Sequence, residues 1–414
     1  MRTCSRRDSS EKNVLLFEAS VTPANRRAYD GVYRYAEAAR WNVRSLEYSL
    51  AADKRKHGRG EQTLAPPELL DLWRPDGVII ECGGRLPQLP LAQFGTLPVV
   101  FMDCHPSLLP GAPITVYTDA ASVARVAVRE LLPRGLASFA YLPFTEDTIW
   151  SRQRGDAFVN LVKANGFDAR QLSFPKGMTG IVQLTKCLVP QLRRLAHPCG
   201  LFACNDDMGR LALTACEQAG LDVPNDVAVV GVDNDEFFCE NATISLTSVR
   251  IDFERFGFVA AQLLDSWMSN RRKRPASVAV ESTDVVRRAS SRRLPNADAR
   301  VVKAIEYIRR NACLGISPPD VVREMGCSRR LADLRFAEAM GHTILDEIHA
   351  VRLARVQELL LKPNVCVSAI PDLCGYGSLS DLCRDFKKRT GQTLRAWSLE
   401  HADDGICEHG LLKR

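Results

Sequence analysis

The fold of the C-terminal part of the chain is decided by the stretch Ile370-Pro-Asp-Leu-Cys-Gly-Tyr-Gly-Ser-Leu-Ser-Asp-Leu-Cys-Arg-Asp-Phe-Lys-Lys-Arg-Thr-Gly-Gln-Thr393. A short helix over Ala369–Cys374 is expected to stop at Gly375, because glycine adopts a positive φ without steric cost. After a tight turn, Ser378 can cap a second helix, which runs to Gly391. Helix, glycine-containing turn and helix form a motif whose second helix lies in the major groove of DNA.

The same plan occurs fifty residues earlier in the chain. Ser317 and Pro318 suit the start of its first helix, expected over 319–325. A long helix over 344–361 joins the two units and would span roughly 27 Å at 1.5 Å per residue. It could hold the two DNA-contacting helices about one turn of DNA apart. The residues that recur are Ser328, Phe336, Gly341 and Thr343, matched by Ser378, Phe386, Gly391 and Thr393, with Gly326 matched one residue out of phase by Gly375.

Basic side chains lie on the second helix of each unit. Arginine suits guanine edges and phosphates because its planar fork donates two parallel hydrogen bonds. Spacing of i, i+3, i+7 places Leu379, Leu382 and Phe386 in the core and leaves their neighbours more exposed. A plain helical bundle with surface arginines would explain one such unit, but two units in matched phase favour DNA binding. The basic residues are Arg329, Arg330 and Arg335 in the first unit and Arg384, Lys387, Lys388 and Arg389 in the second.

Residues 299–398 resemble the AraC/XylS-type DNA-binding domain, most specifically in the stretch quoted above. The resemblance implies base contacts in both second helices, and we add Arg329, Lys387 and Lys388 as further DNA-binding residues. Leu334 and Ala332 stand where the family often has Arg and Leu, Leu394 replaces a usual Pro, and Trp397 replaces a usual Tyr. We therefore expect the second unit to carry more of the specificity. The implied base-contacting positions are Arg330, Asp333, Leu334, Leu379, Ser380, Cys383 and Arg384.

Residues 13–290 alternate between short apolar runs, expected as buried parallel strands, and amphipathic stretches of helical length. Such alternation over this length implies two α/β lobes with open parallel sheets. A strand-like stretch, Ser277–Val286, follows the basic run 271–274. The expected strands are Val14–Phe17, Gly77–Ile80, Val99–Met102, Phe139–Leu142, Gly200–Ala203 and Val227–Val232; the expected helices include Asn25–Arg40, Ala120–Leu132, Arg154–Ala164, Met208–Ala219 and Phe253–Met268.

The sequence therefore predicts a two-lobed α/β domain over 13–290, a linker over 291–297, and an all-α double helix-turn-helix domain over 298–400. Eight Lys and Arg stand against two Asp and Glu between 271 and 297, and sixteen against thirteen between 298 and 400, whereas the front of the chain is slightly acidic. A basic rear half suits a polyanion partner, although basic linkers are also common on solvated surfaces.

Neither a secretory signal nor a long apolar span is visible. The fourteen cysteines include no CxxC pair and no cluster with His at zinc spacing, and several sit in apolar segments. We expect a reduced, cytoplasmic protein without disulfides, metal, cofactor or membrane contact.

The front domain carries no nucleotide-binding glycine loop, no GxSxG elbow and no HExxH motif, and we expect no catalytic residues. Three polar clusters, 151–158, 203–208 and 230–235, follow predicted strands or open helices, which is where open α/β sheets bind ligands. Carboxylate, amide and Arg groups can pair with sugar hydroxyls. Singly, Asn205 or Asp206 could merely cap a helix, but their joint placement favours a ligand site.

Residues 13–290 also resemble the sugar-binding domain of LacI/GalR-type repressors, most clearly over Leu201–Met268. That domain is itself similar to periplasmic binding proteins, so the resemblance implies a periplasmic-binding-protein-like fold for the two lobes. The resemblance implies that Arg154, Asn205 and Asp233 contact the ligand, with Asp119 near the cleft. A LacI-type sensor followed by an AraC-type reader implies a transcription regulator, with an activator role expected, that responds to xylose or another pentose. The same arrangement implies that the protein binds double-stranded operator DNA and a small sugar. It also implies that the protein is a homodimer and, if it is an activator, that it contacts RNA polymerase.

Two other functions remain open from the sequence. One is an α/β enzyme with a helical appendage. A phosphate-binding glycine loop or a pair of nucleophile and base residues would support this function. The other is a DNA-binding protein that is independent of ligand and whose front domain only dimerises. A ligand-induced rise in melting temperature would distinguish the sensor from the latter, because binding to the folded state alone stabilises it.

Overall fold

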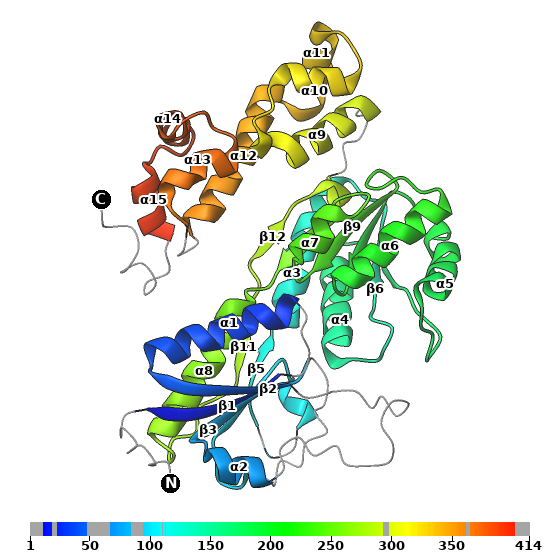
Figure 1. Ribbon diagram of the computed structural model, residues 1–414. Helices are drawn as coiled ribbons and strands as arrows, with labels where there is room; N and C mark the ends of the chain where they lie inside the picture. Colours follow the sequence, from blue (N-terminus) through cyan, green and yellow to red (C-terminus); the bar gives the residue numbers. More distant parts are fainter. Residues whose placement is uncertain are drawn as a thin grey trace. The chain divides into compact units, whose positions relative to one another are not determined.

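The computed structural model describes residues 11–18, 23–47, 67–83, 94–109, 111, 113–292, 298–361 and 365–401. The chain divides into two compact units, residues 1–293 and 294–414. The first is a two-lobed α/β unit and the second is helical (Figure 1), so the predicted fold class is confirmed. Most of the predicted linker, from residue 293 to 297, lies outside the described residues, and the predicted domain limits stay a prediction.

The first lobe is built on a parallel sheet with the strand order β11-β5-β4-β3-β1-β2. Along β1, Val14 and Leu16 pack on one face of this sheet, and Leu15 and Phe17 pack on the other. Burial on both faces explains why the strand reads as a continuous apolar run. The elements are β1 (Lys12–Glu18), α1 (Pro23–Ala38), β2 (Trp41–Glu47), α2 (Pro67–Trp73), β3 (Gly77–Glu81), β4 (Val99–Met102), β5 (Ile114–Thr118), α8 (Phe253–Ser269) and β11 (Val278–Val280).

The second lobe has the strand order β12-β10-β9-β8-β6-β7, in which β12 alone runs antiparallel to its neighbour. Tyr141, Phe158 and Phe202 fill its core, with the Phe158 and Phe202 ring centroids 5.1 Å apart. The elements are α3 (Ala120–Leu131), β6 (Ser138–Leu142), α4 (Ile149–Ala164), β7 (Ala169–Gln171), α5 (Ile181–Arg193), β8 (Cys199–Ala203), α6 (Asp206–Ala219), β9 (Val227–Val232), α7 (Glu236–Asn241), β10 (Thr247–Arg250), β12 (Asp284–Val286) and the 3-10 helix η4 (Ala289–Ser291).

The chain crosses between the lobes three times, after β5, after β10 and after β11. The third crossing corrects one prediction, because the stretch Ser277–Val286 is not one strand. It forms β11 in the first sheet and β12 in the second. Between them, the Ser282 backbone N–H donates to Ser122 Oγ at 2.9 Å, so the intervening residues bond to α3 rather than to either sheet.

The helical unit repeats one plan twice, as predicted. Gly326 and Gly375 end the first helix of each pair with φ of 62° and 71°. Phe336 and Phe386, equivalent in the repeat, are fully buried in two separate cores. The elements are α9 (Ala299–Asn311), the 3-10 helix η5 (Ala312–Leu314), α10 (Pro318–Met325), α11 (Arg329–Met340), α12 (Ile344–Leu360), the 3-10 helix η6 (Val367–Ala369), α13 (Ile370–Cys374), α14 (Leu379–Thr390) and α15 (Leu394–His401).

Two details of the predicted repeat were wrong. Leu379 does not face the core: it is 41% exposed, because it is the first residue of α14 and projects beyond the packed face that Leu382 and Phe386 share. Ser378 caps α14 by accepting from the Asp381 N–H at 3.1 Å, whereas Ser328 occupies the same position before α11 without a capping bond from its side chain.

Among the described residues, no helix is long and apolar enough to span a bilayer. Within the same ranges, no group of three His, Cys, Asp or Glu side chains is arranged to hold a metal ion.

Candidate functional sites

The first candidate site centres on Arg154, which lies on the second turn of α4 and is only 5% exposed. The Tyr141 hydroxyl donates to the Ser151 carbonyl oxygen at 2.6 Å, and this fixes the start of α4 on β6. Gly155 permits the close approach, since a Cβ there would lie 2.5 Å from the Tyr141 ring. Arg154 Nη1 then donates to the Cys204 carbonyl oxygen, 2.6 Å away, just beyond β8.

Two carboxylates from different lobes act on this guanidinium. Asp103 directly follows β4 and Asp233 directly follows β9, both with positive φ, 52° and 101°. Burial raises the pKa of Asp103 to about 6; the positive charge of Arg154 opposes this rise and the negative charge of Asp233 adds to it. Burial also raises the pKa of Asp233, against the charges of Arg154 and Arg27. The charges of the three groups therefore act on one another where the two lobes meet.

Direct hydrogen bonds join the lobes beside these charges. Arg27 Nη2, from α1, donates to the Asn234 carbonyl oxygen at 2.9 Å. Gln153 Nε2, from α4, lies 3.0 Å from His105 Nε2 of the first lobe. These contacts join the two lobes beside the charged groups, and a change in the angle between the lobes alters them.

Aromatic rings complete the arrangement. The Arg154 guanidinium carbon lies 5.0 Å from the centroid of the Trp150 ring, which is 5.4 Å from that of Phe144. Arg154 Nε is buried and has no hydrogen-bond partner among the described residues. Charged donors and acceptors beside partly buried aromatic rings suit a small polar ligand with hydroxyl groups.

Of the four predicted ligand residues, the structure brings Arg154 and Asp233 together. Asn205 Oδ1 accepts from the Met208 N–H at 3.0 Å and caps α6. Asp119 Oδ1 accepts from the Ala121 N–H at 2.9 Å and caps α3, with Arg125 3.8 Å from its other oxygen. Both make structural bonds, and ligand contact by any of the four stays a prediction.

Three residues of the site were missed from the sequence. Asp103 follows the predicted strand Val99–Met102 just as Asp233 follows Val227–Val232, so the same rule, applied to every strand, would have found it. Trp150 directly precedes the polar cluster 151–158. Arg27 gave no signal, because it reaches Asn234 from a distant part of the sequence.

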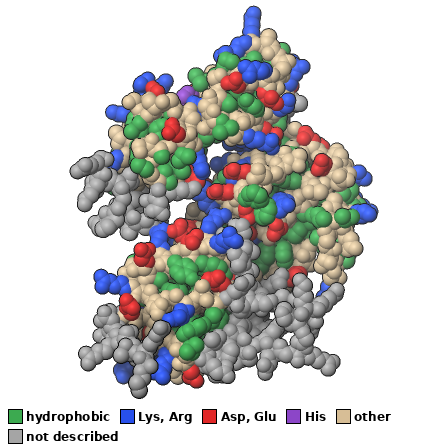
Figure 2. Space-filling view, viewed as in Figure 1, with side chains coloured by type: hydrophobic (Ala, Val, Ile, Leu, Met, Phe, Trp, Pro, Cys, Tyr) green, Lys and Arg blue, Asp and Glu red, His purple; other side chains and the backbone are tan. Residues whose placement is uncertain are grey.

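The second candidate site is the exposed face of α14, on which every predicted DNA-binding residue is exposed. The charge of Arg384 is partly balanced by Asp381, 3.1 Å away, but both side chains are solvated, so the pair contributes little stability and can open. Figure 2 shows Lys and Arg side chains at the surface of the helical unit around α11 and α14. The exposed set is Leu379, Ser380, Cys383, Arg384, Lys387 and Lys388.

Asp385, on the inner side of α14, fixes the orientation of this helix. It accepts hydrogen bonds from the Tyr376 hydroxyl at 2.9 Å and from Arg389 Nε at 2.9 Å, and it lies 3.0 Å from His349 Nδ1 of α12. Burial alone would raise the pKa of Asp385, but these hydrogen bonds outweigh it and the pKa is lowered. The exposed face of α14 is therefore held rigidly on α12.

The matching helix α11 exposes fewer unpaired charges. Arg329 pairs with Asp333 at 2.9 Å, and Arg335 pairs with Asp298 at the start of α9. Arg330 and Leu334 are exposed. Base contacts by these residues remain predictions, and the stronger basic face of α14 fits the expectation that the second unit dominates.

Comparison with known proteins agrees with this architecture. Residues 128–291 match the model of a periplasmic binding protein-like domain, and residues 321–399 match that of a helix-turn-helix domain. The chain is 27% identical over 390 residues to the xylose operon regulatory protein of Escherichia coli (strain K12), covering 91% of this chain and 93% of that protein. It is 28% identical over 290 residues to the protein of that name in Haemophilus influenzae, covering 69% and 74%.

Solved structures share the fold. The structure described as "xylose-binding transcription activator xylR" has a TM-score of 0.61 at 23% identity and covers 95% of this chain and 100% of its own. A lac repressor dimer bound to operator has a TM-score of 0.51 at 17% identity, covering 69% of this chain and 95% of its own. The predicted resemblance, an AraC-type regulator with a periplasmic-binding-protein-like sensor, is confirmed.

The raised pKa of Asp103 predicts a specific pH dependence of stability. In the unfolded chain this carboxyl ionises near pH 3.9, but in the folded protein it ionises at about 6. The wild type should therefore lose stability relative to Asp103→Asn as the pH rises from about 4 to about 6, with a constant difference above that range. Urea unfolding followed by circular dichroism measures this. Parallel stability profiles for the two proteins would contradict the assignment.

Proposed function

We propose that this DNA-binding transcription regulator binds a pentose of the xylose class between the lobes of its sensor domain. The observation that carries the proposal is the buried Arg154, whose Nε has no partner among the described residues, beside Asp103, Asp233 and Trp150. The relatives in Escherichia coli and Haemophilus influenzae, both named as xylose operon regulatory proteins, support the same class of effector.

The chemistry of the site suits a neutral polyol. An ionised carboxylate accepts two hydroxyl hydrogen bonds, each stronger than a bond between neutral groups, and the guanidinium donates to ring or hydroxyl oxygens. The face of Trp150 can pack on the apolar side of a sugar ring. Because Asp103 and Asp233 belong to different lobes, a ligand that contacts both favours one angle between the lobes over the others.

For DNA recognition, we propose that α14 lies in the major groove and α11 reads a second, weaker segment. Arg384 contacts a base edge, and Lys388, near the end of the helix, contacts phosphate. We further propose that the protein is a homodimer that activates transcription through contact with RNA polymerase in the cytoplasm. The lac repressor dimer among the fold neighbours supports the dimer, and two linked readers gain effective concentration on paired half-sites.

An enzymatic function has less support. The relatives that match most of the chain are named as regulatory proteins of the xylose operon. A DNA-binding protein without effector is the remaining alternative, and titration with sugars distinguishes it.

We expect D-xylose to raise the melting temperature of the wild type, with L-arabinose, D-ribose and D-glucose as comparison sugars. Asp233→Ala should weaken xylose binding about 5-fold to 150-fold, since an unpaired buried hydroxyl costs about 1–3 kcal/mol. Asp168→Ala, at an exposed carboxylate of the same lobe, is the matched control and should bind as the wild type does. Equal xylose affinity in all three proteins would remove Asp233 from the site.

Arg384→Ala should relax base preference at one position of the binding site, at a cost of about 1–3 kcal/mol for the preferred base. Lys388→Ala should weaken binding to all sequences alike and reduce its salt dependence. Selection from a random DNA library, followed by affinity measurements at several salt concentrations, tests both. An unchanged sequence preference for Arg384→Ala would argue against this assignment.

A further inference from the structure

We infer that Asn234 and Arg288 transmit the state of the effector site to the segment through which the chain leaves the sensor. This inference rests on the proposed function and supplies its regulatory route. It depends on a chain of short contacts that begins beside Asp233 and ends directly before residue 293, where the first compact unit ends.

Asn234 contacts three parts of the sensor at once. It is 1% exposed and has a φ of 49°. Its carbonyl oxygen accepts from Arg27 of the first lobe at 2.9 Å, and its N–H donates to Ser248 Oγ at 3.0 Å. Its side-chain Oδ1 accepts from Arg288 Nη1 at 3.0 Å. A movement of the first lobe that displaces Arg27 therefore acts on the residue that holds Arg288.

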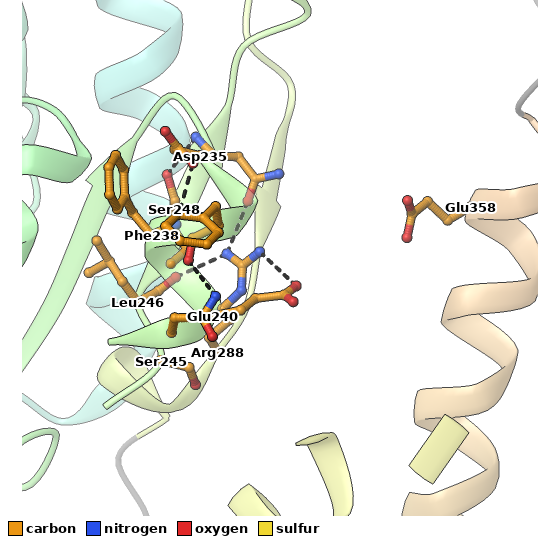
Figure 3. A network of polar contacts seen from close by, with 12 residues as sticks. Asp235, Phe238, Glu240, Ser245, Leu246, Ser248, Arg288 and Glu358 are labelled. Atoms are coloured by element: carbon orange, nitrogen blue, oxygen red, sulfur yellow. Dashed lines mark hydrogen bonds and ion pairs between the residues drawn. The ribbon is translucent and has the colours of Figure 1, made fainter. Parts of the chain in front are cut away.

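Arg288 is 6% exposed, and its guanidinium bonds to residues of neighbouring segments (Figure 3). Nη1 also donates to the Leu246 carbonyl oxygen at 3.0 Å, and Nη2 lies 3.5 Å from a carboxylate oxygen of Glu240. Its backbone N–H donates to Thr247 Oγ1 at 2.7 Å. Because a buried guanidinium is costly to leave unpaired, Arg288 and the backbone that carries it move together with these partners.

The residues after Arg288 form the last anchored turn, η4. Ser290 Oγ donates to the Val229 carbonyl oxygen at 2.7 Å, and the Thr247 N–H donates to Ser290 Oγ at 2.8 Å. Ser291 Oγ lies 2.9 Å from Thr247 Oγ1 and donates to Glu130 Oε1 at 2.9 Å. A change at Arg288 is thus passed to a hydrogen-bonded turn that is joined covalently to the DNA-binding part of the chain.

The neighbouring Arg287 provides a matched control. Its Nε lies 2.6 Å from Glu130 Oε2, so it anchors the same segment. Glu130 belongs to α3 and not to the loop that carries Asp233 and Asn234. Loss of the Arg287 side chain should therefore weaken the attachment of this segment to α3, while the contacts between Asn234 and Arg288 remain.

The first experiment uses the full chain and the DNA sequence that the wild type selects from a random library. Asn234→Gly keeps the positive φ and both backbone hydrogen bonds but removes the side-chain oxygen Oδ1. Arg288→Lys keeps the positive charge but removes the planar guanidinium and its several donors. We expect both variants to bind D-xylose within about threefold of the wild type, whereas the ratio of DNA affinities with and without xylose falls toward one. Arg287→Gln should keep the wild-type ratio, and the Asn234→Gly/Arg288→Lys double variant should be no worse than either single variant.

A second experiment needs no sugar and separates this inference from the proposed function. The N–H groups of Arg288, Ala289 and Ser290 donate to Thr247 Oγ1, Ser245 Oγ and the Ser245 carbonyl oxygen, so they are expected to exchange slowly with deuterium. In sugar-free protein, Asn234→Gly should raise their exchange rates about tenfold. If the wild type fails to bind xylose, the proposed effector is wrong, and the exchange rates still decide the inference. Unchanged exchange at residues 288–290, or an unchanged xylose-dependent ratio in Asn234→Gly, would overturn it.

Discussion

The sensor depends on the burial of one guanidinium, that of Arg154, whose charge acts on carboxylates from both lobes. A buried cation is costly unless it is paired, and Asp103 and Asp233 lie close enough for the charge of Arg154 to oppose the rise in the pKa of each. The two carboxylates also repel one another. A neutral ligand with several hydroxyl groups can donate to the carboxylates and accept from the guanidinium, which stabilises all three groups without adding charge.

The sequence predicts well those features that depend on local pattern. Buried parallel strands read as apolar runs, and the ends of two such runs locate Asp233 and, by the same rule, Asp103. The repeated glycines of the helical unit, Gly326 and Gly375, take the positive φ that their position requires. The step from these patterns to the AraC-type and LacI-type resemblance was correct because both domains carry their signatures over long continuous stretches.

Features that depend on contacts distant in sequence were not predictable. Nothing local in α1 indicates that Arg27 reaches Asn234, more than two hundred residues later. The segment 277–286 has the composition of one strand, and only the separation of the lobes divides it into β11 and β12. Leu379 keeps a helical spacing with Leu382 and Phe386, but its place at the first position of α14 exposes it. Asp119 and Asn205 have the residue types of a ligand site, yet their described bonds cap helices.

The central claim is that Arg154 organises an effector site shared by both lobes. Isothermal titration of D-xylose into the full-length Arg154→Met protein, compared with the wild type, tests it most directly. Circular dichroism establishes that the variant is folded. Loss of a hydrogen bond from a charged donor costs about 1.5–3 kcal/mol, so xylose affinity should fall about 10-fold to 150-fold, while the protein still binds DNA. A folded variant whose xylose affinity stays within about threefold of the wild type would contradict the account.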